Sequence, residues 1–332
     1  MFDNLDIKFE PFKDSQGEEV KLSHGLYSLY MQSPSREDRK KAFESMFNAY
    51  KDMINTVSML YIGNVKKNVF YTQVRKYQSC LDRATSSEDV PVAVYEKLTK
   101  CIDGALSGLH RYMRYRRKAL GYKTLHMYDL HVPIVSGSEK AVEYPEACRL
   151  VKEALKPMGQ EYAQLLDKAF GEGWIDVYEN KGKRSGAYSW GCYGVHPYVL
   201  LNYQKTTHDV FTIAHELGHA MHSYYSNTTQ PFAKAEYKIF VAEVASTVNE
   251  VLLLRHLLKT AEGEEKKYLL SYLLDMFRTT VFRQTQFAEF EYEAHTLAEK
   301  GEALNAQTLN AIYKKLNDKY YLTDGVADDE LI

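Results

Sequence analysis

Helical periodicity is the feature that most restricts what this 332-residue chain can fold into. Apolar residues recur every three or four positions in the stretches 35–61 and 91–120, and again from Thr206 almost to the C-terminus. This spacing places them on one face of an α-helix, and that face must be buried against a neighbouring element. We therefore expect a mainly helical protein.

Residues suited to helix ends stand at the limits of these stretches. Ser35 and Thr206 are each followed three residues later by an aspartate, which is the arrangement of a capping box at a helix N-terminus. Pro91 suits a first helical turn, and Gly121 can end the helix that follows it. The sequence thus predicts helices that begin near Ser35, Pro91 and Thr206.

The stretch 173–204 has a different character. It is rich in glycine, and the run 197–203 consists mostly of residues that favour strands. We predict a small antiparallel β-sheet in this region. Because no repeat, low-complexity tract or linker interrupts the chain, we predict a single, mostly helical domain over residues 1–332.

The composition restricts the partners of the protein. Its 42 lysines and arginines against 44 aspartates and glutamates give a net charge of −2, so we expect no binding to nucleic acid or to an anionic membrane. The basic and aromatic run at 111–118 is interpreted as a solvated helix face. No apolar run approaches the length of a membrane span, and no apolar signal segment is present, so a cytoplasmic location is expected.

Four cysteines, none of them in a CxxC pair, argue against a thiolate zinc site and against a disulfide scaffold. The histidines point to another kind of metal site. His215 and His219 lie four residues apart within the helix predicted to begin at Thr206, so their side chains differ by only about 40° around its axis. Glu216 lies about 100° from His215, which suits a carboxylate that reaches a metal-bound water rather than the metal. This is the HExxH arrangement.

A third ligand is expected downstream. Glu243 stands in an otherwise apolar stretch, where an unpaired carboxylate would be costly and a metal partner would remove the cost. Glu250 lies seven residues further on the same helix face, where it can orient a ligand histidine from outside the metal shell. A surface acid is the alternative interpretation of Glu250. We therefore predict that the zinc-binding helices span residues 206–260.

Two histidines and one glutamate leave a coordination position open, as in catalytic zinc sites. Zinc would bring the pKa of a bound water toward neutrality, and Glu216 would take its proton and pass it to the leaving amine. The sequence therefore predicts metal-assisted hydrolysis of amide bonds.

These residues lie within longer motifs that are similar to a known family. The segments AHELGHAMHSYYS at 214–226 and FVAEVASTVNE at 240–250 resemble the oligoendopeptidase F branch of the thimet-oligopeptidase-like (M3) zinc metallopeptidases. The segments LHMYDLHVP, RSGAYSWGCYGVHPYVLLNYQ and FRQTQFAEFEYEAH resemble the same branch, so the similarity covers nearly the whole chain.

The resemblance implies a large helical, zincin-like peptidase domain with an enclosed channel that admits short peptides as substrates. It implies one Zn²⁺ per chain, with His215, His219 and Glu243 as the ligands and Glu216 as the catalytic acid and base.

The resemblance also implies where substrate binds. The strand that contains Tyr198 and Leu200 resembles the sheet edge that pairs with the substrate backbone, and Gly186 would allow the two backbones to approach. An ordinary sheet edge with structural glycines is the alternative.

Members of this family are considerably longer than this chain. The resemblance therefore implies a fragment without an N-terminal helical lobe and without a downstream segment whose His and Tyr side chains stabilise the oxyanion. An oligopeptidase core is the first interpretation, and a metal-binding but inactive fragment, or half of a split peptidase, is the second. The third is a helical interaction protein with a chance HExxH sequence. Apolar surface left uncovered by missing segments would favour self-association.

Overall fold

The computed structural model describes residues 7–135, 141–321 and 326. The chain forms two compact units. The unit called here the sheet unit comprises Met1–Asp6, Ser23–Leu29 and Val135–Ser271, and the unit called here the helical unit comprises Ile7–Leu22, Tyr30–Ile134 and Tyr272–Ile332. Because each unit draws on segments far apart in the chain, no single cut separates them, and the prediction of one domain over 1–332 stays a prediction.

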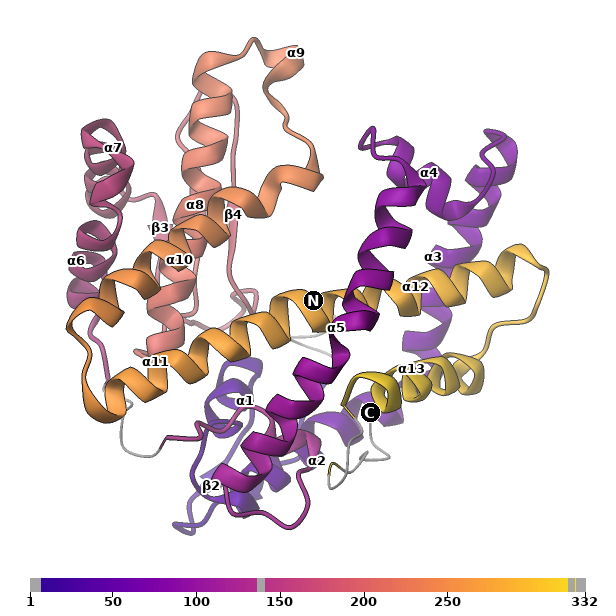
Figure 1. Ribbon diagram of the computed structural model, residues 1–332, viewed down its shortest axis with the longest axis horizontal. Helices are drawn as coiled ribbons and strands as arrows, with labels where there is room; N and C mark the ends of the chain where they lie inside the picture. The colour runs from indigo at the N-terminus through magenta and orange to yellow at the C-terminus, as the bar shows by residue number, and fades with distance from the viewer. Residues whose placement is uncertain (1–6, 136–140, 322–325, 327–332) are drawn as a thin grey trace. The chain divides into compact units, whose positions relative to one another are not determined.

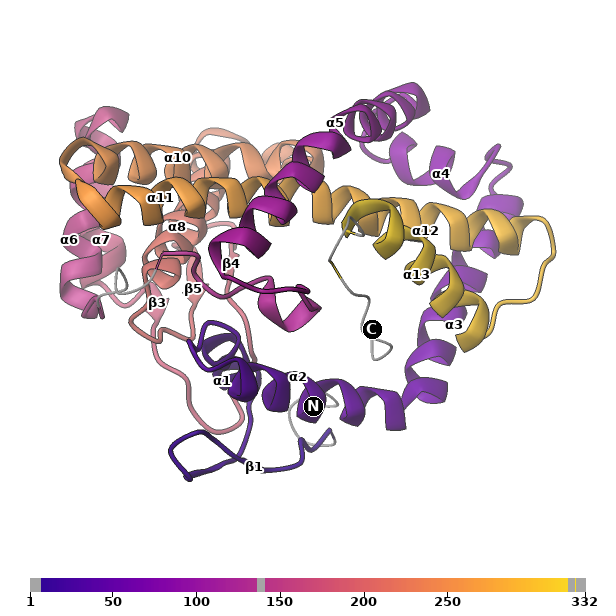
Figure 2. The same cartoon turned by 60° about the horizontal axis from the view of Figure 1, so that its bottom comes forward.

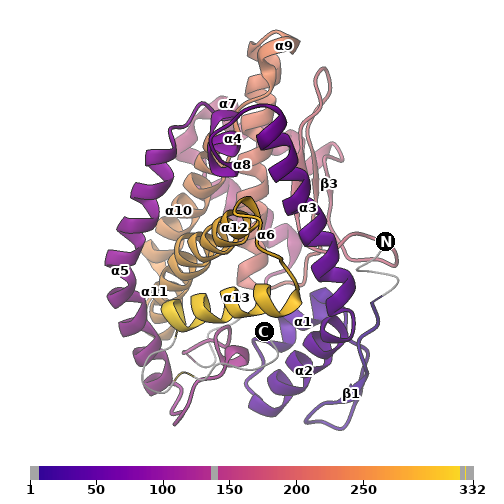
Figure 3. The ribbon, with the colours of Figure 1, turned by 90° about the vertical axis from the view of Figure 1, so that its right-hand side faces the viewer.

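The prediction of a mainly helical fold with a small sheet is confirmed. In the helical unit, α12 and α13 lie side by side and both contact α5 and α3 (Figure 3). A two-stranded antiparallel pair, β1 with β2, precedes these helices. The elements of this unit are β1 (Phe12–Lys13), β2 (Glu19–Val20), α2 (Arg36–Asp52), α3 (Ile54–Val74), α4 (Cys80–Ser86), α5 (Val92–Ala119), the 3₁₀ turn η2 (Met127–Asp129), the π-helix η5 (Phe277–Phe282), α12 (Arg283–Glu299) and α13 (Ala306–Tyr321).

The predicted helix ends are confirmed at two places in this unit. The Ser35 hydroxyl accepts the backbone N–H of Asp38 at the start of α2. The helix predicted from Pro91 is α5, and Gly121 follows it with φ of 70°, in the left-handed region that glycine favours. The apolar stripe over 35–61 is shared by two helices, because the backbone leaves helical geometry at Met53 between α2 and α3.

The run at 111–118 on α5 is not wholly solvated, which corrects its interpretation as an exposed face. Tyr112, Met113 and Arg116 share one side of the helix and are buried. The Arg116 guanidinium donates to Asp275 at 3.0 Å and to the Val132 carbonyl at 2.6 Å. A buried arginine is tolerated because such partners satisfy its charge and its donors, and charge alone does not reveal them in a sequence.

In the sheet unit the three strands lie beside α8 (Figure 1). The apolar core of this unit is formed largely by α6, α7, α8 and α10. Its elements are α1 (His24–Tyr30, of which Tyr30 belongs to the other unit), α6 (Tyr144–Ala154), η3 (Lys156–Met158), α7 (Gln160–Gly171), β3 (Ile175–Asp176), β4 (Tyr188–Trp190), β5 (Tyr198–Leu200), α8 (Thr207–Thr229), α9 (Phe232–Ala235), η4 (Ile239–Val241), α10 (Ala242–Thr260) and α11 (Gly263–Met276), which belongs to this unit as far as Ser271.

The sheet lies within the predicted stretch 173–204, but it is mixed rather than purely antiparallel. The strand order is β3-β5-β4, with β4 antiparallel to β5 and β3 parallel to it. The chain reverses direction twice between β3 and β5, so these two strands run the same way when they pair. β5 is therefore the central strand.

None of the helices in the described part of the chain combines the length and apolar character that a membrane span requires.

Candidate metal centre

The capping box of α8 sets the phase of the helix that carries the histidines. The Thr206 hydroxyl accepts the backbone N–H of Asp209 at 3.1 Å, and the Asp209 carboxylate accepts the backbone N–H of Thr206 at 2.8 Å. This confirms the predicted helix start. Two turns later, His215 and His219 point the same way, and their Nε2 atoms lie 3.1 Å apart.

Helix α10 packs directly against α8, as Figures 1 and 2 show. Gly218 makes this close contact possible: a Cβ atom on it would lie 2.6 Å from Cα of Ser246 and 2.8 Å from the Ala245 carbonyl oxygen. The buried Asn249 side chain adds a polar link, because its amide donates to the Ala214 carbonyl of α8 at 3.0 Å. The two backbones are thus held in contact beside the histidine pair.

This contact brings Glu243, in the first turn of α10, to the histidines. Its Oε2 atom lies 3.3 Å from Nε2 of His215 and 3.4 Å from Nε2 of His219. Tetrahedral coordination with bonds of 2.0–2.2 Å places ligand atoms about 3.3 Å from one another. The triangle formed by the two nitrogens and the oxygen therefore has the dimensions of one face of a zinc tetrahedron. Among the described residues, no other group of three His, Cys, Asp or Glu side chains converges in this way.

Glu250 lies behind His215, at the far side of its ring. Its Oε1 atom forms a short hydrogen bond with Nδ1 of His215. The Glu250 side chain is buried, so it is not the surface acid that the sequence left as an alternative. Burial disfavours the charged imidazole, but the hydrogen bond and the charge of Glu250 outweigh it and raise the pKa of His215. In the neutral imidazole that donates Nδ1–H to Glu250, the lone pair of Nε2 faces Glu243 and His219.

Glu216 is buried beside the triangle but is not part of it. Burial raises the pKa of its carboxyl group to about 7, with the charges of Glu243 and Glu250 acting in the same direction. The charge of His215 and a backbone hydrogen bond from Ser189 of β4 oppose the shift. A carboxyl group that titrates near neutrality suits proton transfer.

The predicted substrate-binding residues lie on and next to the sheet. Both sides of β5 are paired, since Val199 donates to the Trp174 carbonyl at 2.8 Å on one side and β4 pairs on the other. The prediction that the strand of Tyr198 and Leu200 is the free edge is therefore wrong. In the described part of the sheet the outer strand beside α8 is β4. Gly186 precedes β4 with φ of 82°, a turn conformation that favours glycine.

Sequence reasoning missed Ser189 and Asn249. Asn249 carried a usable signal, because an amide within an apolar helical stretch needs a buried partner. Ser189 carried none, because its contribution is a backbone N–H whose direction depends on the strand pairing.

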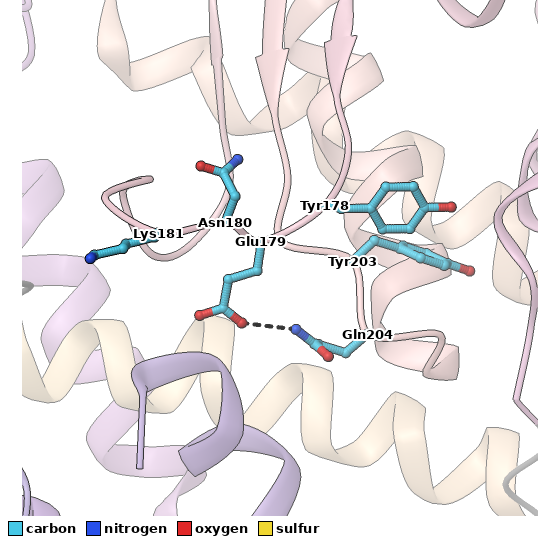
Figure 4. Close-up of a pocket in the computed structure, with 6 residues that line it drawn as sticks. All are labelled: Tyr178, Glu179, Asn180, Lys181, Tyr203 and Gln204. Atoms are coloured by element: carbon cyan, nitrogen blue, oxygen red, sulfur yellow. Dashed lines mark hydrogen bonds between the residues drawn. The ribbon is translucent and has the colours of Figure 1, made fainter. Parts of the chain in front are cut away.

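An open hollow of about 530 Å³ lies beyond the C-terminal ends of β3 and β5 (Figure 4). Glu179 accepts a hydrogen bond from the Gln204 amide there at 3.1 Å. The lining residues include one carboxylate and neither histidine nor cysteine, so they do not form a transition-metal site. The lining residues are Tyr178, Glu179, Asn180, Lys181, Tyr203 and Gln204.

A family model and the similar known proteins all point to peptidases. The model of peptidase family M3 matches residues 29–331. Oligopeptidase PepF of Bacillus subtilis (strain 168) is 44% identical over 332 residues, which are 100% of this chain and 50% of that protein. The chromosomal oligoendopeptidase F of Lactococcus lactis subsp. cremoris is 43% identical over 322 residues, 97% of this chain and 53% of that protein.

A solved structure agrees with these matches. The crystal structure of oligoendopeptidase-F from Enterococcus faecium superposes with a TM-score of 0.71 at 34% identity, and the match covers 100% of this chain and 53% of that one. The chain spans about half the length of the relatives it matches.

The close contact at Gly218 generates a stability prediction. Gly218→Ala should lower the free energy of unfolding by about 1–3 kcal/mol, because the new methyl group meets backbone atoms of α10 that cannot rotate away. Urea unfolding followed by circular dichroism measures the change. Gly104→Ala is the matched control: it lies within α5 with nothing within 4 Å of its Cβ position, so it should stabilise by about 0.5–1 kcal/mol. Stabilisation by both substitutions would show that the two helices do not need a glycine.

Proposed function

This chain belongs to peptidase family M3, and we propose that it carries the zinc-binding and proton-transfer groups of a peptidase that hydrolyses internal bonds of short peptides. The observation that carries the proposal is the triangle of two imidazole nitrogens and one carboxylate oxygen, with sides of 3.1, 3.3 and 3.4 Å. Three protein donors at tetrahedral spacing leave one position open, which is typical of catalytic rather than structural zinc.

His215, His219 and Glu243 would hold the ion. A zinc ion bound there would act as a Lewis acid, polarising the carbonyl of the bond to be cleaved and lowering the pKa of water toward neutrality. Glu250 fixes the His215 ring through Nδ1, so that Nε2 is presented as a donor of electrons rather than of a proton. The donor set of two histidines and a carboxylate with an open position favours zinc over calcium or magnesium, which prefer oxygen ligands.

Glu216 is the proposed acid and base. Its carboxylate takes a proton from water as the water attacks the peptide carbonyl, and the same oxygen then gives that proton to the leaving amine. In the metal-free site burial raises the pKa of Glu216 to about 7, and the charge of a bound zinc ion would lower it and favour the carboxylate that accepts the proton. The position of Glu216 next to, but outside, the donor triangle supports this division of labour.

The outer edge of β4 is the proposed binding place for the substrate backbone. In an antiparallel ladder, residues alternate between facing the neighbouring strand and facing away from it. The backbone N–H of Val199 is used toward β3, so its partner Ser189 faces away from β5, toward Glu216. A peptide added along this edge would therefore pass beside the proposed base.

Side chains of such a peptide would meet an aromatic surface. Trp190 and its cross-strand partner Tyr198 are exposed, whereas Val199 is buried, so Trp190 and Tyr198 lie on the sheet face away from the core. Tyr188 and Leu200 form the adjacent pair on this face. Peptide residues opposite Tyr188 and Trp190 would project to the same side, within contact distance.

The metal proposal predicts about one zinc equivalent per chain, bound by three protein donors. Elemental analysis after zinc titration and gel filtration measures the stoichiometry. His219→Ala removes one of three donors and should abolish tight binding, whereas His208→Ala, an exposed histidine near the start of the same helix, should leave it unchanged. Less than about a tenth of an equivalent in the titrated wild-type chain would contradict the metal site.

Glu216→Gln separates proton transfer from metal binding. The amide keeps the shape of the side chain but does not accept the proton, so hydrolysis of a quenched fluorescent peptide should fall by about 10²-fold or more at unchanged zinc content. Glu236→Gln, an exposed acid after α9, is the control. A Glu216→Gln chain with the kcat of the wild type would exclude Glu216 as the base. A zinc-loaded wild-type chain without turnover would leave the metal site standing and overturn the peptidase activity of this chain.

Trp190→Ala tests the proposed edge. For peptides with a bulky apolar residue near the scissile bond, KM should rise roughly threefold to tenfold while kcat changes little, since a cross-strand aromatic contact is lost but no reacting group moves. The same substitution should hardly affect a peptide with glycine at that place. Val195→Ala, an exposed apolar residue between β4 and β5, is the control. Equal KM values for wild type and Trp190→Ala across all peptides would place the substrate elsewhere.

A further inference from the structure

Ser246 is a fully buried hydroxyl residue in the contact between α8 and α10. Its Oγ lies 2.7 Å from Oε2 of Glu243, the same carboxylate oxygen that faces the two histidines. The same Oγ atom lies 3.1 Å from the backbone carbonyl oxygen of Glu243. We infer that Ser246 positions Glu243 as a metal ligand by donating a hydrogen bond to its ligating oxygen, an inference that rests on the proposed zinc site.

Glu243 needs such a partner because little else restrains it. Its side chain is 65% exposed and has several rotatable bonds, so an unrestrained carboxylate would visit many rotamers. Among the described residues, its carboxylate makes polar contacts with Ser246, His215 and His219. The serine is the one hydroxyl donor in this set, and its hydrogen bond leaves further lone pairs of the carboxylate for a cation.

Packing alone does not account for a serine at this position. The approach of Gly218 to Cα of Ser246 requires a small residue, and alanine would meet that requirement with a higher helix propensity. A buried hydroxyl also costs free energy unless it is hydrogen-bonded. The hydroxyl is therefore explained by the bond it makes to the Glu243 carboxylate.

Bonding back to the helix is the structural alternative, because serine and threonine often donate to a carbonyl of the preceding turn. Thr247 shows that behaviour without the carboxylate contact: its hydroxyl lies 2.5 Å from the Glu243 backbone carbonyl, and the residue is half-buried. Ser246 and Thr247 thus share the backbone acceptor, and only Ser246 reaches Oε2. The neighbouring pair provides a matched control within one helix.

The test compares Ser246→Ala with Thr247→Ala. The zinc dissociation constant is measured by competition with a chromogenic chelator, and thermal melting of the metal-free chains is recorded in parallel. Ser246→Ala should weaken zinc binding about tenfold to hundredfold, as is usual when a partner of a metal ligand is removed, with little change in the melting temperature. Thr247→Ala should bind zinc like the wild type.

A second measurement separates positioning from packing. In a Glu243→Ala background the carboxylate is gone, so adding Ser246→Ala should have no further effect on residual zinc binding. The visible spectrum of the cobalt-substituted chain should change for Ser246→Ala and not for Thr247→Ala, because only the former alters the ligand geometry.

The outcomes distinguish this inference from the proposed function. A wild-type chain that does not bind zinc would overturn the metal site itself. A wild-type chain that binds zinc, with Ser246→Ala equally tight, would overturn the role of Ser246 and leave the site intact. Equal weakening by Ser246→Ala in the wild-type and Glu243→Ala backgrounds would also overturn it, because the hydroxyl would then act through packing.

Discussion

The contact between α8 and α10 at Gly218 and Ser246 is the interaction on which the rest of the site depends. Gly218 has no Cβ atom, which would otherwise clash with the backbone of α10, so the two backbones can come into contact. Glu243 precedes Ser246 by three residues and therefore reaches the histidines from the first turn of α10. Glu250 follows by four residues and meets His215 from its other ring nitrogen. A ligand and the partner of another ligand are thus fixed by a single helix–helix contact.

Much of this arrangement can be read from the sequence where the information is local. The phase of α8 follows from its capping box and the spacing of two histidines, so the pair and the separate direction of Glu216 are predictable from 3.6-residue periodicity. The apolar stretch around Glu243 predicts a buried carboxylate that needs a partner, but the side chain is 65% exposed, so this premise is wrong although the carboxylate does face the histidines. Which residues contact the Glu243 carboxylate, the two histidines and the Ser246 hydroxyl, depends on how α8 and α10 pack. That packing is decided by the absence of a side chain at Gly218, which a periodicity argument does not weigh.

In the sheet, too, the positions of the strands are predictable from the sequence, but their pairing is not. A glycine-rich stretch followed by strand-forming residues predicts where strands lie, and all three strands fall within it. Pairing order is a tertiary property, because any strand with free N–H and C=O groups can accept either neighbour. β5 is central because both of its edges are paired, and its residue types do not show this, since Tyr198 is exposed while Val199 is buried. The prediction that Arg116 on α5 is solvated is wrong for a similar reason, because its acidic partner, Asp275, is distant in the chain.

The faces of α8 explain how one helix serves several tasks at once. With about 100° per residue, Glu216 is rotated about 100° from His215, Gly218 about 60° in the opposite sense, and His219 about 40° toward Glu216. Gly218 faces α10, and Glu216 receives a backbone hydrogen bond from β4 on the other flank. Ser223, about 80° from His215, lies on that same flank, where a Cβ added to Gly191 at the end of β4 would approach its side chain to 2.6 Å. The two histidines therefore face the space between the helix that supplies the third ligand and the strand edge beside the base. A rotation of α8 by one residue, about 100°, would turn the histidines away from Glu243, Gly218 away from α10 and Glu216 away from β4. The capping box at Thr206 fixes the start of the helix, so it contributes to the site although it lies two turns away.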